Sequence, residues 1–157
     1  MKKQPPRNIY CLEGNWRPNP RCKQSVRPML DILRDAAGIK YIYRKCNTRE
    51  EFFEYLRQYT FERYRNYTIL YIAFHGRPNK IQIGRDLVTL REIADVLEGF
   101  LAHRIVYHAH ETREYRRFPK PYKSRHPRRL PQGCRFYSSH GVGDDVALFL
   151  NQVNFNS

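Results

Sequence analysis

Cysteine is scarce in this sequence, and the cysteine positions exclude two kinds of site. The four cysteines are Cys11, Cys22, Cys46 and Cys134, and no two of them form a C-x-x-C pair. A zinc ribbon and a dithiol redox motif both need such a pair, so the sequence contains no local motif for either site. We therefore expect reduced thiols, as in a cytoplasmic protein.

Long hydrophobic runs are also missing. No stretch of the sequence approaches the roughly 20 apolar residues that a membrane-spanning helix needs. Near the N-terminus, Pro5, Pro6 and Arg7 stand where a signal peptide would have its apolar segment. These absences predict a soluble, cytoplasmic protein with no membrane partner.

Acidic residues are few compared with basic ones. The chain has 15 Asp and Glu against 29 Lys and Arg, which gives a formal net charge of +14 and a pI of about 9.9. This surplus attracts polyanions without specificity, and it carries no information about the fold. The 157 residues have the size of one domain. We expect no resident cofactor.

Apolar periodicity and capping patterns indicate strands that alternate with helices. Strands are predicted at residues 8–12, 39–45, 68–76 and 103–109; helices are predicted from Ser25 to Gly38, from Thr48 to about Tyr64 and from Thr89 to about Gly99; a small hairpin at 80–88 turns at Gly84. This order implies right-handed crossovers. It predicts an α/β fold with a doubly wound, mainly parallel sheet.

The third predicted strand, TILYIAFHG at 68–76, is apolar throughout until it ends in His75 and Gly76. Continuous apolar character is typical of a parallel strand covered by helices on both faces, so this strand should lie near the middle of the sheet. Ligands bind at the carboxyl ends of the strands in such sheets. His75 is therefore a candidate catalytic residue, and the alternative is a polar strand end with Gly76 serving the turn.

Three segments resemble the caspase-like (caspase-haemoglobinase) fold of cysteine peptidases. They are AFHG at 73–76, TLREIADVLEG at 89–99 and RIVY at 104–107. The chain resembles more closely a small uncharacterised prokaryotic family of that layout, which opens with Leu-Glu-Gly-x-Trp. That opening is echoed here by Leu12, Glu13, Gly14 and Trp16. The resemblance covers about residues 8–107 and implies a caspase-like α/β domain there.

The resemblance also implies a catalytic pair, of which one member is missing. In caspase-like enzymes, a His-Gly at the end of one strand supplies an imidazole, and a cysteine at the end of the next strand is the nucleophile. His75 and Gly76 match the first part, but the next strand runs into YHAHET at 107–112. Cys134 is the remaining candidate, although QGCRFYSS indicates the start of a later strand. The resemblance thus implies a peptidase homologue, inactive or impaired, with a protein or peptide as substrate or partner.

The composition changes after the predicted fourth strand. Residues 108–157 are predicted to form a basic, Pro/Arg-rich, irregular segment that is poorly specified by pattern. Basic side chains can neutralise phosphates while aromatic rings stack on unpaired bases, so an alternative function is a nucleic-acid-binding module with non-specific affinity. Its candidate residues are Arg116, Arg117, Tyr122, Lys123, Arg128 and Arg129. A solvated basic tail is the other interpretation.

The same change is typical of a chain translated out of its original reading frame. GDDVALF at 143–149 can be encoded by bases that spell Trp-Val-Thr-Thr-Ser-Leu-Phe one position over. A Trp followed by small hydroxylated residues resembles the C-terminal part of the family named above. We keep as a hypothesis that residues 108–157 are frame-altered.

A second alternative function is a metal-dependent hydrolase. His108 and His110 are two residues apart, so on a strand both face the same side. With His75 and Glu111 nearby, they can hold zinc or another metal that prefers imidazole. Three such ligands and one water molecule would form a hydrolytic site.

Overall fold

The computed structural model describes residues 7–15, 25–77, 79–100, 105–110 and 135–140, and for 77, 105–110 and 135–140 it describes the backbone alone. The elements are β1 (Ile9–Glu13), α1 (Arg27–Ala37), β2 (Tyr41–Lys45), α2 (Arg49–Tyr59), the 3₁₀ helix η1 (Glu62–Tyr64), β3 (Ile69–Ala73), β4 (Gly76–Arg77), β5 (Lys80–Ile83), β6 (Asp86–Thr89), α3 (Leu90–Val96), β7 (Ile105–His110) and β8 (Arg135–His140).

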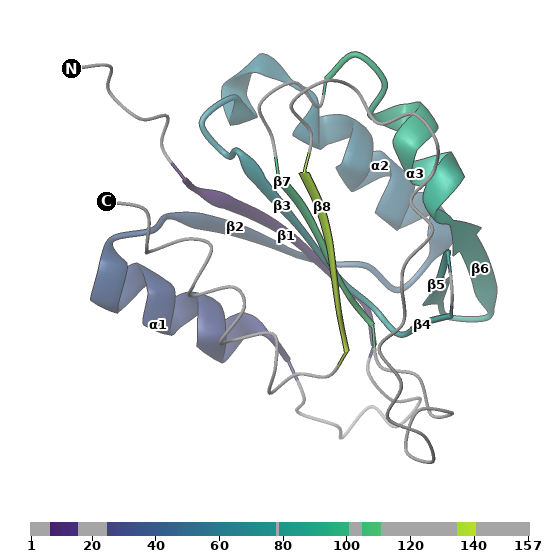
Figure 1. The fold of residues 1–157 in the computed structure, drawn as a ribbon, viewed down its shortest axis with the longest axis horizontal. Helices are drawn as coiled ribbons and strands as arrows, with labels where there is room; N and C mark the ends of the chain where they lie inside the picture. The colour runs from purple at the N-terminus through teal and green to yellow at the C-terminus, as the bar shows by residue number, and fades with distance from the viewer. Residues whose placement is uncertain (1–6, 16–24, 78, 101–104, 111–134, 141–157) are drawn as a thin grey trace.

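The main sheet has the strand order β2-β1-β3-β7-β8, and each neighbouring pair is parallel. Helix α1 covers one face of this sheet, and α2 and α3 cover the other (Figure 1). The predicted doubly wound, mainly parallel α/β fold is confirmed. Strand β3 is central, and all five of its residues are buried, as its continuous apolar sequence predicted.

Side chains of β1 and β3 alternate between two cores. Tyr10 and Leu12 pack with the residues of α2 and α3, including Phe52 and Ile93. On the opposite face, Cys11 of β1 and Tyr71 of β3 pack with residues of α1. Because both faces are covered, neither strand can have a polar side, and this explains why their sequences lack the usual alternation.

Helix ends follow the predicted capping residues with three corrections. One is that α3 ends at Val96 and not near Gly99, which lies in the turn that follows the helix. Helix α1 begins after Val26 rather than after Ser25, although the Ser25 hydroxyl still accepts a hydrogen bond from the Arg27 N–H at 3.1 Å. Gly38 ends α1 with a left-handed φ of 66°, as predicted. Helix α2 ends at Tyr59 and not near Tyr64, because the backbone at Phe61 is extended before η1 begins.

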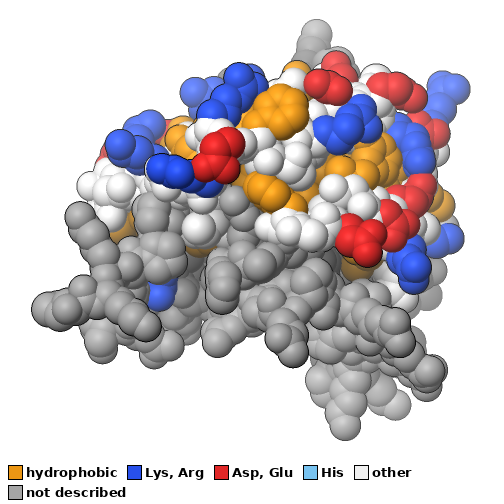
Figure 2. Space-filling view, turned by 90° about the horizontal axis from the view of Figure 1, so that it is seen from above, with side chains coloured by type: hydrophobic (Ala, Val, Ile, Leu, Met, Phe, Trp, Pro, Cys, Tyr) orange, Lys and Arg blue, Asp and Glu red, His pale blue; other side chains and the backbone are white. Residues whose placement is uncertain are grey.

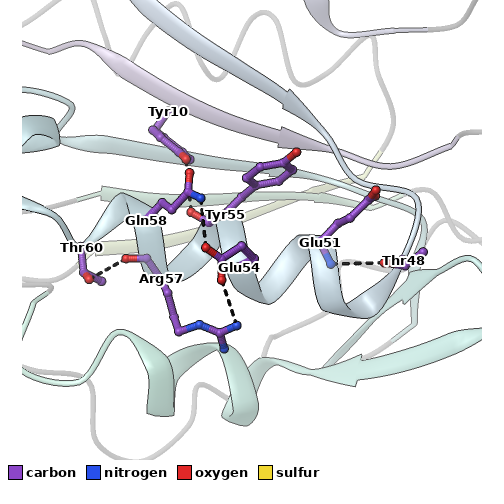
Figure 3. Close-up of polar contacts among 8 residues, drawn as sticks. All are labelled: Tyr10, Thr48, Glu51, Glu54, Tyr55, Arg57, Gln58 and Thr60. Atoms are coloured by element: carbon purple, nitrogen blue, oxygen red, sulfur yellow. Dashed lines mark hydrogen bonds and ion pairs between the residues drawn. The ribbon is translucent and has the colours of Figure 1, made fainter.

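The capping patterns at the two later helices are confirmed. The Thr48 side chain accepts from the Glu51 N–H at the start of α2, as Figure 3 shows. At the start of α3, Thr89 and Glu92 form both hydrogen bonds of a capping box. These local bonds fix where each helix begins, so the sequence alone could place them.

Tyr10 ties the sheet to α2. Its hydroxyl donates to the Tyr55 carbonyl oxygen at 3.2 Å, while Glu54 on the same helix accepts from Arg57 and Gln58 (Figure 3). Burial raises the pKa of Tyr10 to about 12, so this phenol remains a donor at neutral pH. The helix is thus held against the central strands by a buried aromatic residue with a polar tip.

A second, smaller sheet and a late strand complete the fold. A three-stranded sheet has the order β4-β5-β6, and its β5–β6 hairpin turns at Gly84 with a φ of 59°, as predicted. Strand β8 begins directly after Cys134 and confirms the later strand that the sequence predicted there. Within the segment 108–157, the structure describes β8 and the last three residues of β7. Within the described residues, no helix has the length and apolar character that crossing a membrane requires.

Candidate functional site at the carboxyl edge of the sheet

The carboxyl ends of β1 and β3 lie side by side, with Glu13 in register with Ala73. The chain leaves β1 toward β2 on one side, and the later strands lie on the other side of β1. Such a reversal is the point where open α/β sheets bind ligands, just beyond the strand ends. The segments that follow these two strands, at Gly14 and at His75, therefore form the candidate site.

Gly14 and Phe74 fit together at this edge. The Gly14 N–H donates to the Ala73 carbonyl oxygen at 3.0 Å. A Cβ added to Gly14 would lie only 2.4 Å from Cδ1 of Phe74, so the Phe74 ring occupies the space that any side chain would need. That ring is buried and packs edge to face on Phe52. The residue at position 14 thus sets the position of the segment that carries His75.

His75 lies at the carboxyl edge, as the sequence predicted, but β3 ends at Ala73, so His75 stands two residues beyond the strand and not within it. Its side chain is partly buried, and its carbonyl oxygen accepts from the Gln82 N–H at 2.7 Å. Gly76 begins β4 and pairs with Ile81 of β5. The hairpin therefore fixes the backbone at both residues, while a catalytic role for His75 and Gly76 stays a prediction.

Glu13 is a buried carboxylate that sequence reasoning did not single out as a site residue. Its side chain is 1% exposed. One carboxylate oxygen accepts from the Val26 N–H at 2.7 Å, and the other accepts from the hydroxyl groups of Ser25, at 2.7 Å, and Tyr43. The N-terminus of α1 therefore compensates the charge of Glu13. A signal was present in the sequence, because an acidic residue ends an otherwise apolar strand.

Glu13 contributes to the raised pKa of both Tyr43 and Cys11. Burial, followed by the hydrogen bond to Glu13, raises the pKa of Tyr43. Burial, followed by the charge of Glu13, raises the pKa of Cys11 well above its ordinary value. Both groups remain protonated at neutral pH, so the Tyr43 hydroxyl stays a hydrogen-bond donor to Glu13.

The described cysteines lack the properties of a nucleophile. Cys11 and Cys46 are both free and buried. The pKa of Cys46 is raised to about 12, first by burial and then by the charge of Glu51. A reactive cysteine needs a lowered pKa and access to substrate, so neither residue qualifies. Cys134, the candidate from the sequence, lies outside the described residues, as does Cys22.

The other predicted site residues lie where side chains are not described. Arg116, Arg117, Tyr122, Lys123, Arg128 and Arg129 fall outside the described residues, so nucleic-acid binding stays a prediction. His108 and His110 belong to β7, where His108 is in register with Ile72 of β3. Among the side chains that the structure describes, no three His, Cys, Asp or Glu residues are grouped so that they could hold a metal ion.

Charges on the described surface are mixed. Figure 2 shows Lys and Arg interspersed with Asp and Glu over the described part of one face. Across the described surface, charges are paired along helical turns, as in Arg34 with Asp31 at 2.9 Å and Arg65 with Glu62 at 3.0 Å. Residues 111–134, in contrast, contain eight Lys and Arg and two Glu. We therefore expect attraction to polyanions to depend on that segment.

Comparison with models of protein families identifies the family of this chain. A family model described as "Family of unknown function (DUF6642)" matches residues 6–114, which include the edge formed by Gly14, Phe74 and His75. No curated protein matches the chain. The matched residues end close to Arg113, where the composition becomes strongly basic. Because the match covers more than half of its length, the chain belongs to the DUF6642 family of unknown function.

Proposed function

We propose that this chain is a caspase-like cysteine-peptidase homologue that has lost peptide-bond cleavage and retains a protein- or peptide-binding edge. The observation that carries the proposal is the position of His75, two residues beyond the central strand, beside a strand whose end has no thiol. In caspase-like enzymes, which residues 8–107 resemble, the position of His75 holds the catalytic imidazole, and the end of the neighbouring strand holds the nucleophilic cysteine.

The sheet register supports this pairing of positions. Ala73, two residues before His75, is in register with Ala109 of the parallel neighbour β7. The residue that follows Ala109 is His110. The resemblance implies a nucleophilic cysteine near this end of the strand, and His110 stands there instead. An imidazole can accept a proton and orient a ligand, but it cannot replace the sulfur that forms the acyl intermediate.

The described thiols support the loss of cleavage. Cys11 and Cys46 are buried, and the pKa of each is raised. Cys11 lies within β1, and Cys46 follows the edge strand β2, so neither stands at the end of the strand next to His75. Among the described side chains, His75 supplies an imidazole at this edge on a backbone that the β4–β5 pairing fixes, and we infer that this edge binds a protein or peptide without cleaving it.

A thiol-directed probe tests the proposal. We expect iodoacetamide, at a low concentration and under native conditions, to leave the chain without stoichiometric labelling, while all four thiols react after unfolding. Peptide mapping by mass spectrometry identifies the labelled residue. Rapid native labelling of Cys134 that His75→Ala slows, together with hydrolysis of peptide substrates, would contradict the proposal.

Restoring the missing thiol gives a positive test. We expect His110→Cys to create a thiol whose native alkylation is roughly tenfold faster with His75 than in the double variant with His75→Ala, because a nearby imidazole favours the thiolate. His108→Cys is the matched control, since position 108 lies two residues further from the edge, in register with Ile72. Equal rates with and without His75 at position 110 would show that the two positions do not act together.

A further inference from the structure

Strand β2 is at the edge of the main sheet. It pairs with β1 on one side, and within the described part of the chain no strand pairs with its other side (Figure 1). The hydrogen bonds at its two ends show which residues face β1. The Ile9 N–H donates to the Lys40 carbonyl oxygen at 2.9 Å. The Cys46 N–H donates to the Glu13 carbonyl oxygen at 2.8 Å, so Lys40 and Cys46 both turn their backbone groups inward.

The outward-facing backbone groups follow from the alternation of the strand. The register between β1 and β2 has no bulge, so every second residue from 40 to 46 faces β1. The residues between them, Tyr41, Tyr43 and Lys45, turn their N–H and C=O groups away from β1. No described residue forms a hydrogen bond with these groups. Three donors and three acceptors are therefore open to another extended chain.

Contacts on both faces of the sheet hold this edge in place. The Tyr41 hydroxyl donates to Asp31 of α1 at 2.6 Å, and on the opposite face the Arg44 guanidinium lies 5.5 Å from the centre of the Tyr55 ring of α2. Strands β1 and β3 are fully buried, whereas four residues of β2 are half-buried and Lys45 is exposed. The edge is thus rigid and accessible, which lowers the entropy cost of binding another strand.

The cations around this edge have no carboxylate partner among the described residues. Lys40 and Lys45 are exposed, and neither forms an ion pair there. Arg27 is exposed and lies 5.7 Å from the centre of the Tyr43 ring, again without an ion pair. Arg44 is half-buried and likewise lacks a carboxylate. The open backbone is therefore surrounded by unneutralised positive charge.

We propose that β2 binds an acidic, extended peptide segment of a partner protein as an additional strand. In this mode of recognition, main-chain hydrogen bonds to the open edge supply affinity, and complementary side chains supply specificity. A second copy of this chain is disfavoured, because it would bring the same cations to the same edge, and edge lysines prevent such self-pairing. Strand β1 separates β2 from the strand that precedes His75, so the inference does not rest on the proposed function.

Fluorescence anisotropy with the full chain tests the proposal. The probe is a fluorescein-labelled peptide of about eight residues in which Glu and Thr alternate. Its matched control is the same peptide N-methylated at every residue, which keeps the charge and loses every main-chain donor. We expect the control to bind at least about tenfold more weakly, because the bonds to the outward carbonyl groups are lost. Equal affinity of the two peptides, or no binding of the first, would overturn the proposal.

Variants of the chain separate the charges of the edge from its backbone. We expect Lys40→Gln combined with Lys45→Gln to weaken binding by roughly tenfold, whereas Lys80→Gln, at an exposed lysine of β5, should stay within about twofold of the parent. Lys45→Pro should bind more weakly than Lys45→Gln, because it also removes an outward N–H. Circular dichroism tests whether each variant is folded, and the N-methylated peptide needs no variant. A loss in Lys80→Gln equal to that in the double variant would contradict the assignment to β2.

Amide exchange measured by NMR locates the bound peptide. The peptide should slow exchange at the outward amides of Tyr41, Tyr43 and Lys45. The amides of Ile42 and Arg44, which face β1, are internal controls and should change little. Binding that protects none of the outward amides would overturn the proposal. So would protection of these amides without peptide in a chain that sedimentation shows to dimerise, because a second copy would then occupy the edge.

Discussion

The Phe74 ring lies where a side chain at position 14 would have to be, since a Cβ on Gly14 would lie 2.4 Å from Cδ1 of Phe74. This contact joins the segment after β1 to the segment that carries His75. Gly38, whose Cβ would meet nothing within 4 Å, shows that a glycine in this chain need not be surrounded in this way.

We expect Gly14→Ala to destabilise the protein by about 1–3 kcal/mol, because the added methyl group forces Phe74 out of its packing on Phe52. Urea denaturation followed by circular dichroism measures the change. The double variant with Phe74→Leu should lose less than the sum of the two single changes, because the smaller side chain leaves room for the methyl group. Additive losses would mean that the two residues do not compete for space.

Tyr43→Phe tests the network around Glu13. Removing the hydroxyl group takes a donor from a buried carboxylate, so we expect a loss of about 1–3 kcal/mol in the free energy of unfolding. Tyr41→Phe is the matched control, since the Tyr41 hydroxyl donates to Asp31 near the surface, at 2.6 Å. The control should lose less, and an equal loss in both variants would contradict the special role of Glu13.

Glu92 predicts a dependence of stability on pH. The Thr89 N–H, then Arg49 and the Thr89 hydroxyl, lower the pKa of Glu92 to about 2. Because this value lies below the ordinary one near 4.5, the contribution of Glu92 is fully present above about pH 4.5 and is lost as the pH falls toward 2.

Comparison of the parent with Glu92→Gln measures that contribution. The free energy of unfolding between pH 2 and pH 6 should rise less steeply with pH in Glu92→Gln than in the parent. Glu98→Gln, a change at an exposed residue, is the control and should follow the parent. Parallel curves for the parent and Glu92→Gln would contradict the lowered pKa.

The nucleic-acid alternative is tested by salt. If the attraction to polyanions is only electrostatic, binding to a single-stranded RNA homopolymer should disappear at physiological ionic strength. Specific binding should persist there and should be lost when the arginines of the basic segment are neutralised together, as Arg116, Arg117, Arg128 and Arg129 changed to Gln. Binding that survives this change would exclude the segment as a nucleic-acid site.

The hypothesis of an altered frame is tested in the coding DNA. It predicts that translation from about codon 100 to the stop in another frame gives a Gly-Ser-Cys-like end to the fourth strand, which is β7 in the structure. If neither alternative frame gives such a peptide, the histidines of β7 and the basic segment are genuine features of the protein.

Local patterns determined which elements form and where they begin. The apolar run of β3 predicted its central place, Thr48 and Thr89 predicted the starts of α2 and α3, and Gly84 predicted the hairpin turn. Each of these features depends on residues close together in the chain, so the sequence contains the whole interaction. The end of α2 could not be placed in this way, because an extended backbone at Phe61 interrupts a pattern that remains compatible with a helix.

The sequence by itself placed His75 at the end of a buried strand, and it showed that the next strand ends without a thiol. Only the tertiary structure joined Glu13 to Ser25 and Tyr43, placed Phe74 over Gly14, and brought His140 into register with His110. These contacts link residues 12 to 60 positions apart, and strand order and register decide them. No local pattern in a single sequence specifies that pairing, because it arises from burying the two faces of one sheet under its helices.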